Sequence, residues 1–437
     1  MIDTPLVEHF FRHEYGKLVA MLSRKVGVQH IEAVEDAVQA ALMAALDTWT
    51  VKGQPNNPTA WLYTVAQNHL IGELRQTNSR IAILKRQQAP HIGSEQGSID
   101  NLHETNINNI EQSIQAEYFL SNELNDDILR MLFVVCHKNI PLESQLVFAL
   151  KTLCGFDVRE ISIRLFASEA NIYKRLTRAR AILKKMPRLL DDLNPTEYEQ
   201  RLPAVHKILY LLFTEGYLSS HIEIAIRREL CEEALRLTTI LAENIHGKNP
   251  KTYALLALMY FHMARLPARH SPNEGLLLLE EQDRSLWERW GIQVGLVWLE
   301  KSAKGNDFSR YHAEAGVAAE HCLSPSFNET QWQNIVECYT LLEHASPSPI
   351  HRLNRAVAVA EWKGPNAGLE VVSNFSAPDW LRESYQWNAV LADLHNRCKN
   401  TEFASTFRDK ALASCPSLAV RTLLEKRLNF YVKIEPN

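Results

Sequence analysis

The stretch "DVREISIRLFASEANIYKRLTRARAILKK" (157–185) has the pattern of two short helices joined by a tight turn. Asp157 and Glu160 have the three-residue spacing of a capping box, and Ser168 is a suitable N-cap for the second helix. The second segment, 171–185, contains six cationic residues and no acidic residue. Two helices, a tight turn and a basic amphipathic second helix predict a helix-turn-helix that binds the major groove of DNA.

The second helix divides into an apolar face and a polar face. Apolar residues that we expect to be buried recur at steps of four, three and four, at Ile172, Leu176, Ala179 and Leu183. Near the N-terminus of the helix, the candidates for reading base edges are Glu169, Asn171, Lys174 and Arg175. Further along, the candidates for phosphate contacts are Arg178, Arg180, Lys184 and Lys185. A solvated surface helix is the alternative, and the capped helix and turn before it favour DNA binding.

The composition favours an all-α fold with more than one domain. Glycine is scarce, with 16 residues in 437, and apolar residues recur at spacings of three and four almost throughout. The chain holds 47 Lys+Arg and 51 Asp+Glu, and residues 191–437 carry the acidic excess. The two parts are therefore expected to have different partners.

Several features predict a cytoplasmic protein that has no membrane partner. The seven cysteines show neither a C-x-x-C pair nor zinc-like spacing, so we expect reduced and mostly buried thiols. No apolar run approaches the ~18 residues that a membrane span needs. The N-terminal residues lack the pattern of a signal peptide.

Breaks in the helical pattern divide the chain into four parts. The expected parts are a small helical domain at 6–77, a flexible linker at 78–125, the helix-turn-helix domain at 126–189 and a long helical region at 190–437. Pro58 is well suited to the first position of a helix in the first domain. The linker is expected because Asn, Gln, Ser and His dominate it, and a short helix is expected near 113–120.

The segment "WLYTVAQNHLIGELRQ" (61–76) mixes aromatic with polar and basic residues. Rings next to such groups suit unpaired bases, which stack on aromatic side chains. The candidates are Trp61, Tyr63, Asn68, His69 and Arg75. The alternative is that both rings belong to the core, as aromatic residues at helical spacing more often do.

These motifs together resemble a known family. "VEDAVQAALMAALDTW" (34–49), the aromatic segment and the 157–185 stretch look like the two domains of extracytoplasmic-function sigma factors, the promoter-specificity subunits of bacterial RNA polymerase. The resemblance covers about residues 6–189. It implies that the first domain binds the clamp helices of core RNA polymerase and the −10 promoter element. It implies that the second domain binds the −35 element and the polymerase flap.

The resemblance also implies roles for individual residues. Contacts with core RNA polymerase are implied for Glu35, Asp36 and Gln39. Contacts with the −10 element are implied for Asn56, Asn57, Trp61, Tyr63, Asn68, His69 and Arg75. Contacts with the −35 element are implied for residues 168–178, which begin with Ser168.

Candidate helix pairs recur in the region 190–437, at 296–322, 356–372 and 389–416. Ala367 and Ala404 are 37 residues apart, near the ~34-residue period of tetratricopeptide repeats. This half is similar to the sigma-factor subgroup that has a long tetratricopeptide-like extension. We expect it to regulate the sigma domains by packing on them or by binding a regulatory protein or ligand.

Two motifs in this half allow a functional and a structural interpretation. For "LYLLFTEGY" (209–217) we favour a buried helix that ends at Gly216 over a pocket. For "EEQDRSLWERW" (280–290) a polar cluster that binds a ligand and a solvated helix start beside core tryptophans are equally supported.

No catalytic motif is found. The sequence has no phosphate-binding glycine loop and no nucleophile elbow, and its 17 histidines lack metal-site spacing. We therefore expect no enzymatic activity, no metal and no cofactor. One alternative function is a helix-turn-helix activator or repressor with a helical-repeat sensory domain, which would bind duplex DNA by itself. Another is an enzyme with a helical catalytic domain in 190–437.

Overall fold

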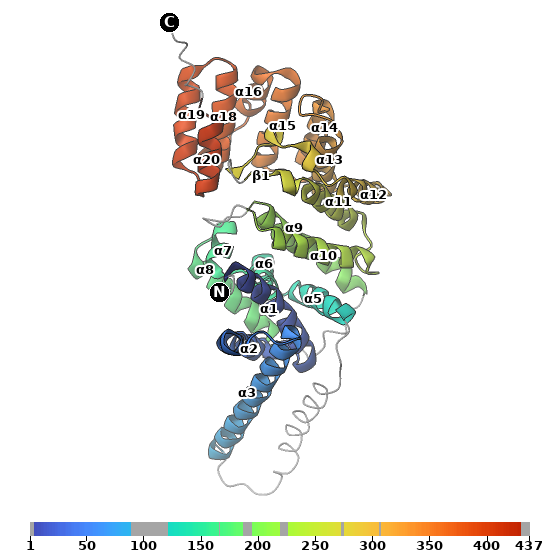
Figure 1. Ribbon diagram of the computed structural model, residues 1–437, viewed down its shortest axis with the longest axis vertical. Coiled ribbons are helices and arrows are strands. Elements are labelled where there is room, and N and C mark those ends of the chain that lie inside the picture. The colour runs from blue at the N-terminus through green and yellow to red at the C-terminus, as the bar shows by residue number, and fades with distance from the viewer. Residues whose placement is uncertain are drawn as a thin grey trace. The chain divides into compact units, whose positions relative to one another are not determined.

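The computed structural model describes residues 4–88, 121–165, 167–186, 195–218, 226–271, 275–305 and 307–429. This part of the chain is almost entirely helical, which confirms the predicted all-α fold (Figure 1). The chain forms two compact units, Met1–Ile208 and Leu209–Asn437, here called unit 1 and unit 2. The helix expected near 113–120 lies outside the described residues. Among the described helices, none has the length and apolar character that a membrane span requires.

Unit 1 spans the two ranges predicted as small domains, 6–77 and 126–189, and holds their helices in one compact unit. Its first helices are α1 (Thr4–Val26), the short 3-10 turn η1 (Val28–His30), α2 (Ile31–Lys52) and α3 (Pro58–Gln88). The next are α5 (Ser121–Val135), α6 (Leu142–Phe148), the π-helical turn η2 (Ala149–Leu153), α7 (Val158–Arg164) and α8 (Glu169–Leu183). The helix α9 (Pro195–Tyr217) contains the division between the two units.

Local signals place the ends of these helices as predicted. The capping box before α7 is present, because the Asp157 backbone N–H donates to Glu160 Oε2 at 2.8 Å and the Glu160 N–H donates to Asp157 Oδ1 at 2.6 Å. Ser168 caps α8, and its Oγ accepts from the Asn171 N–H at 3.3 Å. Pro58 is the first residue of α3. These bonds satisfy helix N–H groups that have no partner within the helix.

Both ends of the range predicted as a linker, 78–125, are helical. Residues 78–88 continue α3 rather than starting the linker, and α5 already begins at Ser121. The reason is local: the segment "NSRIAILKRQQ" is rich in good helix formers and contains neither Gly nor Pro. The polar composition of the whole segment outweighed this signal in the sequence-based interpretation.

The helices of the two small domains pack directly on one another within unit 1. Helix α1 lies against α5 and the π-helical turn η2 (Figure 1). Gly16 permits this approach, because a Cβ at that position would lie 2.0 Å from the Leu153 carbonyl oxygen. Arg24 Nη1 donates to Asp127 Oδ1 at 3.0 Å and joins α1 to α5.

Unit 2 is an array in which most helices pack on helices close to them in sequence, while α13 packs mainly on α11 and α20 also contacts β2. Its first part holds α10 (Arg228–Glu243), α11 (Pro250–Arg265), η3 (Leu266–Ala268), β1 (His270–Ser271), β2 (Gly275–Leu276), η4 (Leu279–Glu281) and η5 (Arg284–Leu286). Then follow α12 (Arg289–Ser302), α13 (Arg310–Leu323), α14 (Trp332–Ala345), α15 (Pro349–Lys363) and α16 (Pro365–Ser373). The last are α17 (Asp379–Arg382), α18 (Tyr385–Arg397), α19 (Thr401–Ala413) and α20 (Leu418–Arg427). The two strands pair antiparallel, with His270 opposite Leu276.

The three predicted helix pairs of unit 2 are present, as α12 with α13, α15 with α16 and α18 with α19. The prediction that Gly216 ends a helix is wrong, since Gly216 is still helical in α9. Its role is close packing: a Cβ there would lie 2.7 Å from both the Arg227 oxygen and the Cys231 nitrogen. Three of the seven predicted free thiols are buried and the other four are partly exposed.

We predict that Gly16→Ala lowers the stability of unit 1 by about 1–3 kcal/mol, because the added methyl group must displace α1 from the Leu153 carbonyl. Gly72→Ala is the matched control in α3, where a Cβ meets no atom within 4 Å. That change is expected to stabilise the protein by about 0.5–1 kcal/mol through helix propensity. Denaturant unfolding of both variants measures the difference, and equal effects would contradict the close packing.

Candidate nucleic-acid interface

Helix α8 presents the expected basic face to solvent. Its apolar residues are buried as predicted, at Ile172, Leu176, Ala179 and Leu183. Seven of the nine residues predicted to bind the −35 element are exposed, namely Ser168, Glu169, Asn171, Lys174, Arg178, Lys184 and Lys185. Four of these seven are cationic, so α8 carries a cationic surface that is accessible to a nucleic acid.

Arg175, the eighth residue of this set, forms a surface ion pair. Its Nη2 atom lies 2.7 Å from Glu143 Oε2, at the start of α6, and the Glu143 side chain is 69% exposed. The Arg175 side chain itself is only 17% exposed. Because its partner is in solvent, the pair contributes about 1 kcal/mol.

Arg180, the ninth residue, is engaged with a residue that was predicted to bind the polymerase. Arg180 Nη2 lies 2.6 Å from Glu35 Oε2, and Thr152 Oγ1 donates to Glu35 Oε1 at 2.7 Å. Glu35 is only 3% exposed. In this arrangement of α2, η2 and α8, Glu35 is buried and Arg180 is paired with it, so neither side chain is free for its predicted contact, and both contacts stay predictions.

Burial is the largest influence on the acidity of Glu35. It raises the pKa of this carboxyl above the usual value of 4.5, while the charge of Arg180 and the hydrogen bond from Thr152 act in the opposite direction. A carboxylate in such a place needs its partners, since an uncompensated buried charge costs several kcal/mol.

The exposed face of α2 carries the remaining residues predicted to contact the polymerase. Asp36 and Gln39 are exposed as that role requires. The same face continues into Met43 and Leu46, which are 68% and 46% exposed. Sequence reasoning missed these two apolar residues, although their positions four and seven after Gln39 place them on its helix face. Exposed apolar side chains in a row are a feature of protein-binding surfaces.

The two aromatic candidates in α3 differ in exposure. Tyr63 is only 5% exposed, and Lys25 Nζ of α1 lies 5.8 Å from its ring centroid. The prediction that Tyr63 stacks on a base is therefore wrong, and the alternative of a core ring holds. Trp61 is partly exposed at the start of the helix and packs against Trp49, with ring centroids 5.5 Å apart.

The other residues predicted to bind the −10 element lie on the surface. Asn56, Asn68, His69 and Arg75 are exposed. Asn57 is exposed as well, and its Oδ1 caps α3 by accepting from the Ala60 N–H at 3.0 Å. The structure thus brings the loop before α3 and one polar side of α3 to the surface beside Trp61.

An exposed aromatic residue of α8 lies within the range 168–178 that the resemblance implies for the −35 element, although it was not named individually. The Tyr173 ring is 58% exposed, next in sequence to Lys174 on the cationic helix. An exposed ring beside a lysine can contact a thymine methyl group or a sugar.

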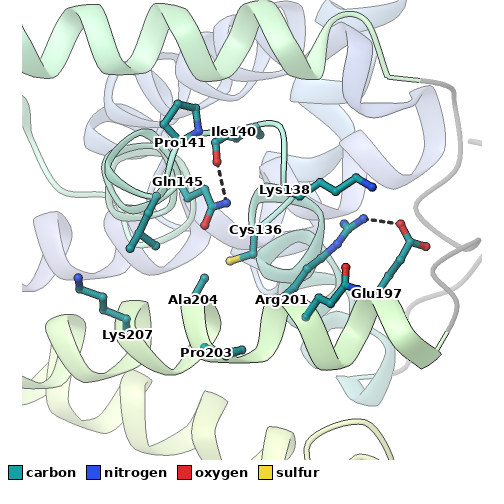
Figure 2. Close-up of a pocket in the computed structure, with 12 residues that line it drawn as sticks. Cys136, Lys138, Ile140, Pro141, Gln145, Glu197, Arg201, Pro203, Ala204 and Lys207 are labelled. Carbon is teal, nitrogen blue, oxygen red and sulfur yellow. Dashed lines mark hydrogen bonds and ion pairs between the residues drawn. The ribbon is translucent and has the colours of Figure 1, made fainter. Parts of the chain in front are cut away.

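A cavity of unit 1 lies between the α5–α6 turn and α9 and has a volume of about 530 Å³ (Figure 2). Its polar side chains already have structural roles. Gln145 Nε2 donates to the His137 and Ile140 carbonyls at 3.0 and 2.9 Å, and Arg201 binds the Phe133 carbonyl and Glu197. Burial raises the pKa of the Cys136 thiol, so this residue is a protonated packing group. No catalytic set is formed here.

The described residues contain no group of three or more His, Cys, Asp or Glu side chains that could hold a metal ion.

Comparisons with known proteins connect this geometry to a family. Residues 10–80 match the model of sigma-70 region 2, and residues 201–303 match a family of unknown function, DUF6596. An uncharacterized protein of Rhizobium meliloti (strain 1021) is 28% identical over 408 residues, which cover 93% of this chain and 92% of that protein. No solved structure matches the chain.

Residues 10–80 are similar to sigma-70 region 2. This segment spans most of α1, α2 and α3 up to residue 80, the helices that hold the predicted polymerase and −10 residues. The similarity supports a sigma-factor role in promoter recognition and transcription initiation, and it implies interaction with core RNA polymerase and promoter DNA.

We predict that Arg180→Gln destabilises unit 1 by about 3 kcal/mol, because it leaves the buried Glu35 carboxylate without its counter-charge. Glu35→Gln should cost only about 1 kcal/mol, since the amide keeps a hydrogen bond and Arg180 is partly exposed. Arg175→Gln, on the same helix with an exposed partner, is the control and should cost less than about 1 kcal/mol. Urea unfolding of the three variants measures the order of their losses in stability.

The penalty of Arg180→Gln should also depend on pH. Loss of the Arg180 charge raises the pKa of Glu35 in the folded protein further, so the folded variant holds the Glu35 proton to higher pH than the unfolded chain does. The penalty is smallest below the unfolded pKa near 4.5, where Glu35 is protonated in both states, and it grows as pH rises through the folded pKa. A penalty that is the same at pH 4 and pH 8 would contradict the buried ion pair.

Proposed function

We propose that this chain is a sigma factor of the extracytoplasmic-function type that binds core RNA polymerase, recognises −35 and −10 promoter elements and initiates transcription. The observation that carries the proposal is the exposed cationic face of a capped helix-turn-helix, in the same compact unit as a sigma-70 region 2 domain. Such a protein acts in the bacterial cytoplasm, where polymerase and promoter DNA are found.

The proposed contacts follow the exposed residues. Lys174, Arg178, Lys184 and Lys185 of α8 would hold the −35 duplex, with Arg180 joining them only when it leaves Glu35. On α3, the exposed Asn68, His69 and Arg75 would contact the −10 element together with the loop before that helix. On α2, the row that begins with Asp36 and Gln39 and includes Met43 and Leu46 would bind the polymerase clamp.

The main alternative, an activator or repressor that binds duplex DNA alone, does not require a region 2 domain. A sigma factor needs a second surface for the −10 element because a few phosphate contacts on one helix give only weak, salt-sensitive binding. The chain offers that second surface on α3, in the segment that matches region 2. This favours the sigma-factor proposal over the alternative.

The first test is transcription in vitro by the full chain with purified bacterial core polymerase on a genomic promoter library. Transcripts that depend on the added chain and share a promoter motif are expected. Replacing both Lys174 and Arg178 with Ala should reduce these transcripts at least tenfold. It should also lower the salt dependence of promoter binding by the equivalent of about two phosphate contacts.

The matched control replaces two exposed lysines of unit 2, Lys248 and Lys304, with Ala. This variant loses the same number of positive charges and should transcribe as the unchanged chain does. Absence of transcripts, together with tight duplex binding by the chain alone, would favour an activator or repressor instead.

We also propose that unit 2, a tetratricopeptide-like array, regulates the sigma domains. Stacked helix pairs build extended binding surfaces, and α12–α13, α15–α16 and α18–α19 are such pairs. Comparing the full chain with residues 1–218, which keep α9 whole, in the same transcription assay tests this. A difference in promoter-dependent transcripts of severalfold, in either direction, is expected, and identical activity and polymerase binding would contradict a regulatory role.

A further inference from the structure

The segment "EEQDRSLWERW" (280–290) contributes a buried arginine–tryptophan cluster to unit 2. Two short 3-10 turns, η4 and η5, cross this segment, and Trp287 is buried at its end. Arg284 reaches α13, where its Nη1 atom donates to the His321 and Ser324 carbonyls, each at 2.7 Å. The guanidinium groups of Arg284 and Arg265 lie 4.5 and 5.6 Å from the Trp287 ring centroid.

Arg265, at the end of α11, lines a cavity of about 350 Å³ within unit 2. Other polar residues on the wall of this cavity are His262, Arg310, Glu314 and His321. Small-molecule sites in proteins begin at about 300 Å³. The cavity is therefore large enough for a small metabolite.

The two arginines of this cavity differ in their partners. Arg310 has a carboxylate: its Nε and Nη2 atoms donate to Glu314 Oε1 at 3.0 and 2.7 Å, and Nη2 also donates to the Tyr210 hydroxyl at 3.1 Å. Arg265 is only 7% exposed, and its Nε is enclosed without a hydrogen-bond partner. Within the described ranges, Arg265 forms neither an ion pair nor a side-chain hydrogen bond.

Glu314 lines the same cavity but is paired with Arg310, and the other neighbouring titratable groups do not offset the charge of Arg265. Burial, together with the nearby Arg265, keeps the pKa of His262 well below its usual value and lowers that of His321 to about 3, so both rings are neutral. Burial raises the pKa of Tyr339 and raises that of Cys322 to about 11, so neither is an anion near neutral pH. Arg284 adds a second positive charge rather than a negative one. An arginine that is nine-tenths buried without a counter-ion costs several kcal/mol.

We propose that this cavity is a binding site for a small organic anion whose phosphate or carboxylate group pairs with Arg265. A planar guanidinium binds either oxyanion through two parallel hydrogen bonds. The Nδ1 atoms of His262 and His321 are both enclosed without a partner, and a neutral imidazole can supply one N–H donor to the same ligand. The proposal concerns unit 2 alone and does not depend on the sigma-factor function of unit 1.

A second cavity of about 330 Å³ adjoins the first, because Leu279, His321, Tyr339 and Asn354 line both. Its own wall includes the apolar residues Phe327, Trp332 and Ile335. It also carries Glu280, Glu361 and Arg427, of which Arg427 is paired with Glu280. An anion that carries a flat apolar part, such as an aromatic carboxylate or a nucleotide, therefore fits the pair of cavities better than an inorganic ion does.

The test is thermal unfolding of the full chain in inorganic phosphate or in sodium benzoate, each compared with sodium chloride at equal ionic strength. We expect the Tm to rise by a few degrees with at least one of the two probes. Arg265→Met should abolish that rise. It should also increase the Tm in chloride, because it removes the uncompensated charge. Arg421→Met, on the exposed side of α20, is the control and should keep the response to the anion.

The two probes distinguish a phosphate ligand from a carboxylate ligand. A Tm that neither probe raises above the chloride value would overturn the proposal, and so would a response that Arg265→Met preserves. If Arg265→Met instead lowers the Tm in every buffer, Arg265 is a structural residue that stacks on Trp287, and the proposal is wrong.

Discussion

The packing of the helices in unit 1 depends on how the charge of one buried carboxylate is compensated. Glu35 lies where α2, the turn η2 and α8 meet, and it receives a hydrogen bond from Thr152 and an ion pair from Arg180. An ion pair of this kind adds little net stability, but it fixes how the two helices pack. Any shift that separates the partners leaves a buried charge with neither a counter-ion nor solvent around it. Gly16 allows α1 to approach Leu153 on the same side, so these contacts define how the region 2 helices sit on the helix-turn-helix.

The features that the sequence predicted well are those set by residues a few positions apart in the chain. The capping box at Asp157 and Glu160, the Ser168 cap, the start of α3 at Pro58 and the buried face of α8 all depend on residues within one or two helical turns. The helix pairs of unit 2 were found for the same reason, since each consists of two periodic segments and a short turn.

What the sequence could not predict depends on long-range packing. Glu35 and Arg180 are 145 positions apart, and no local pattern indicates that a carboxylate on α2 is buried against the basic helix. The burial of Tyr63 is also a tertiary property, because a ring at that position is compatible with either face of α3. The uncompensated charge of Arg265 is of the same kind: it is recognised only once the surroundings show that Arg310 has a carboxylate and Arg265 has none.

The Glu35–Arg180 pair has a thermodynamic consequence for the proposed function. Suppose that polymerase binding and promoter binding both require α2 and α8 to separate. The first ligand to bind then supplies the free energy of that separation, and the second ligand binds a protein in which the two helices are already apart. The first partner to bind would then raise the affinity of the second, and linkage requires the effect to be equal in both directions. On its own, the free chain would occupy promoters poorly, and its cationic helix would become fully competent mainly within the assembled holoenzyme.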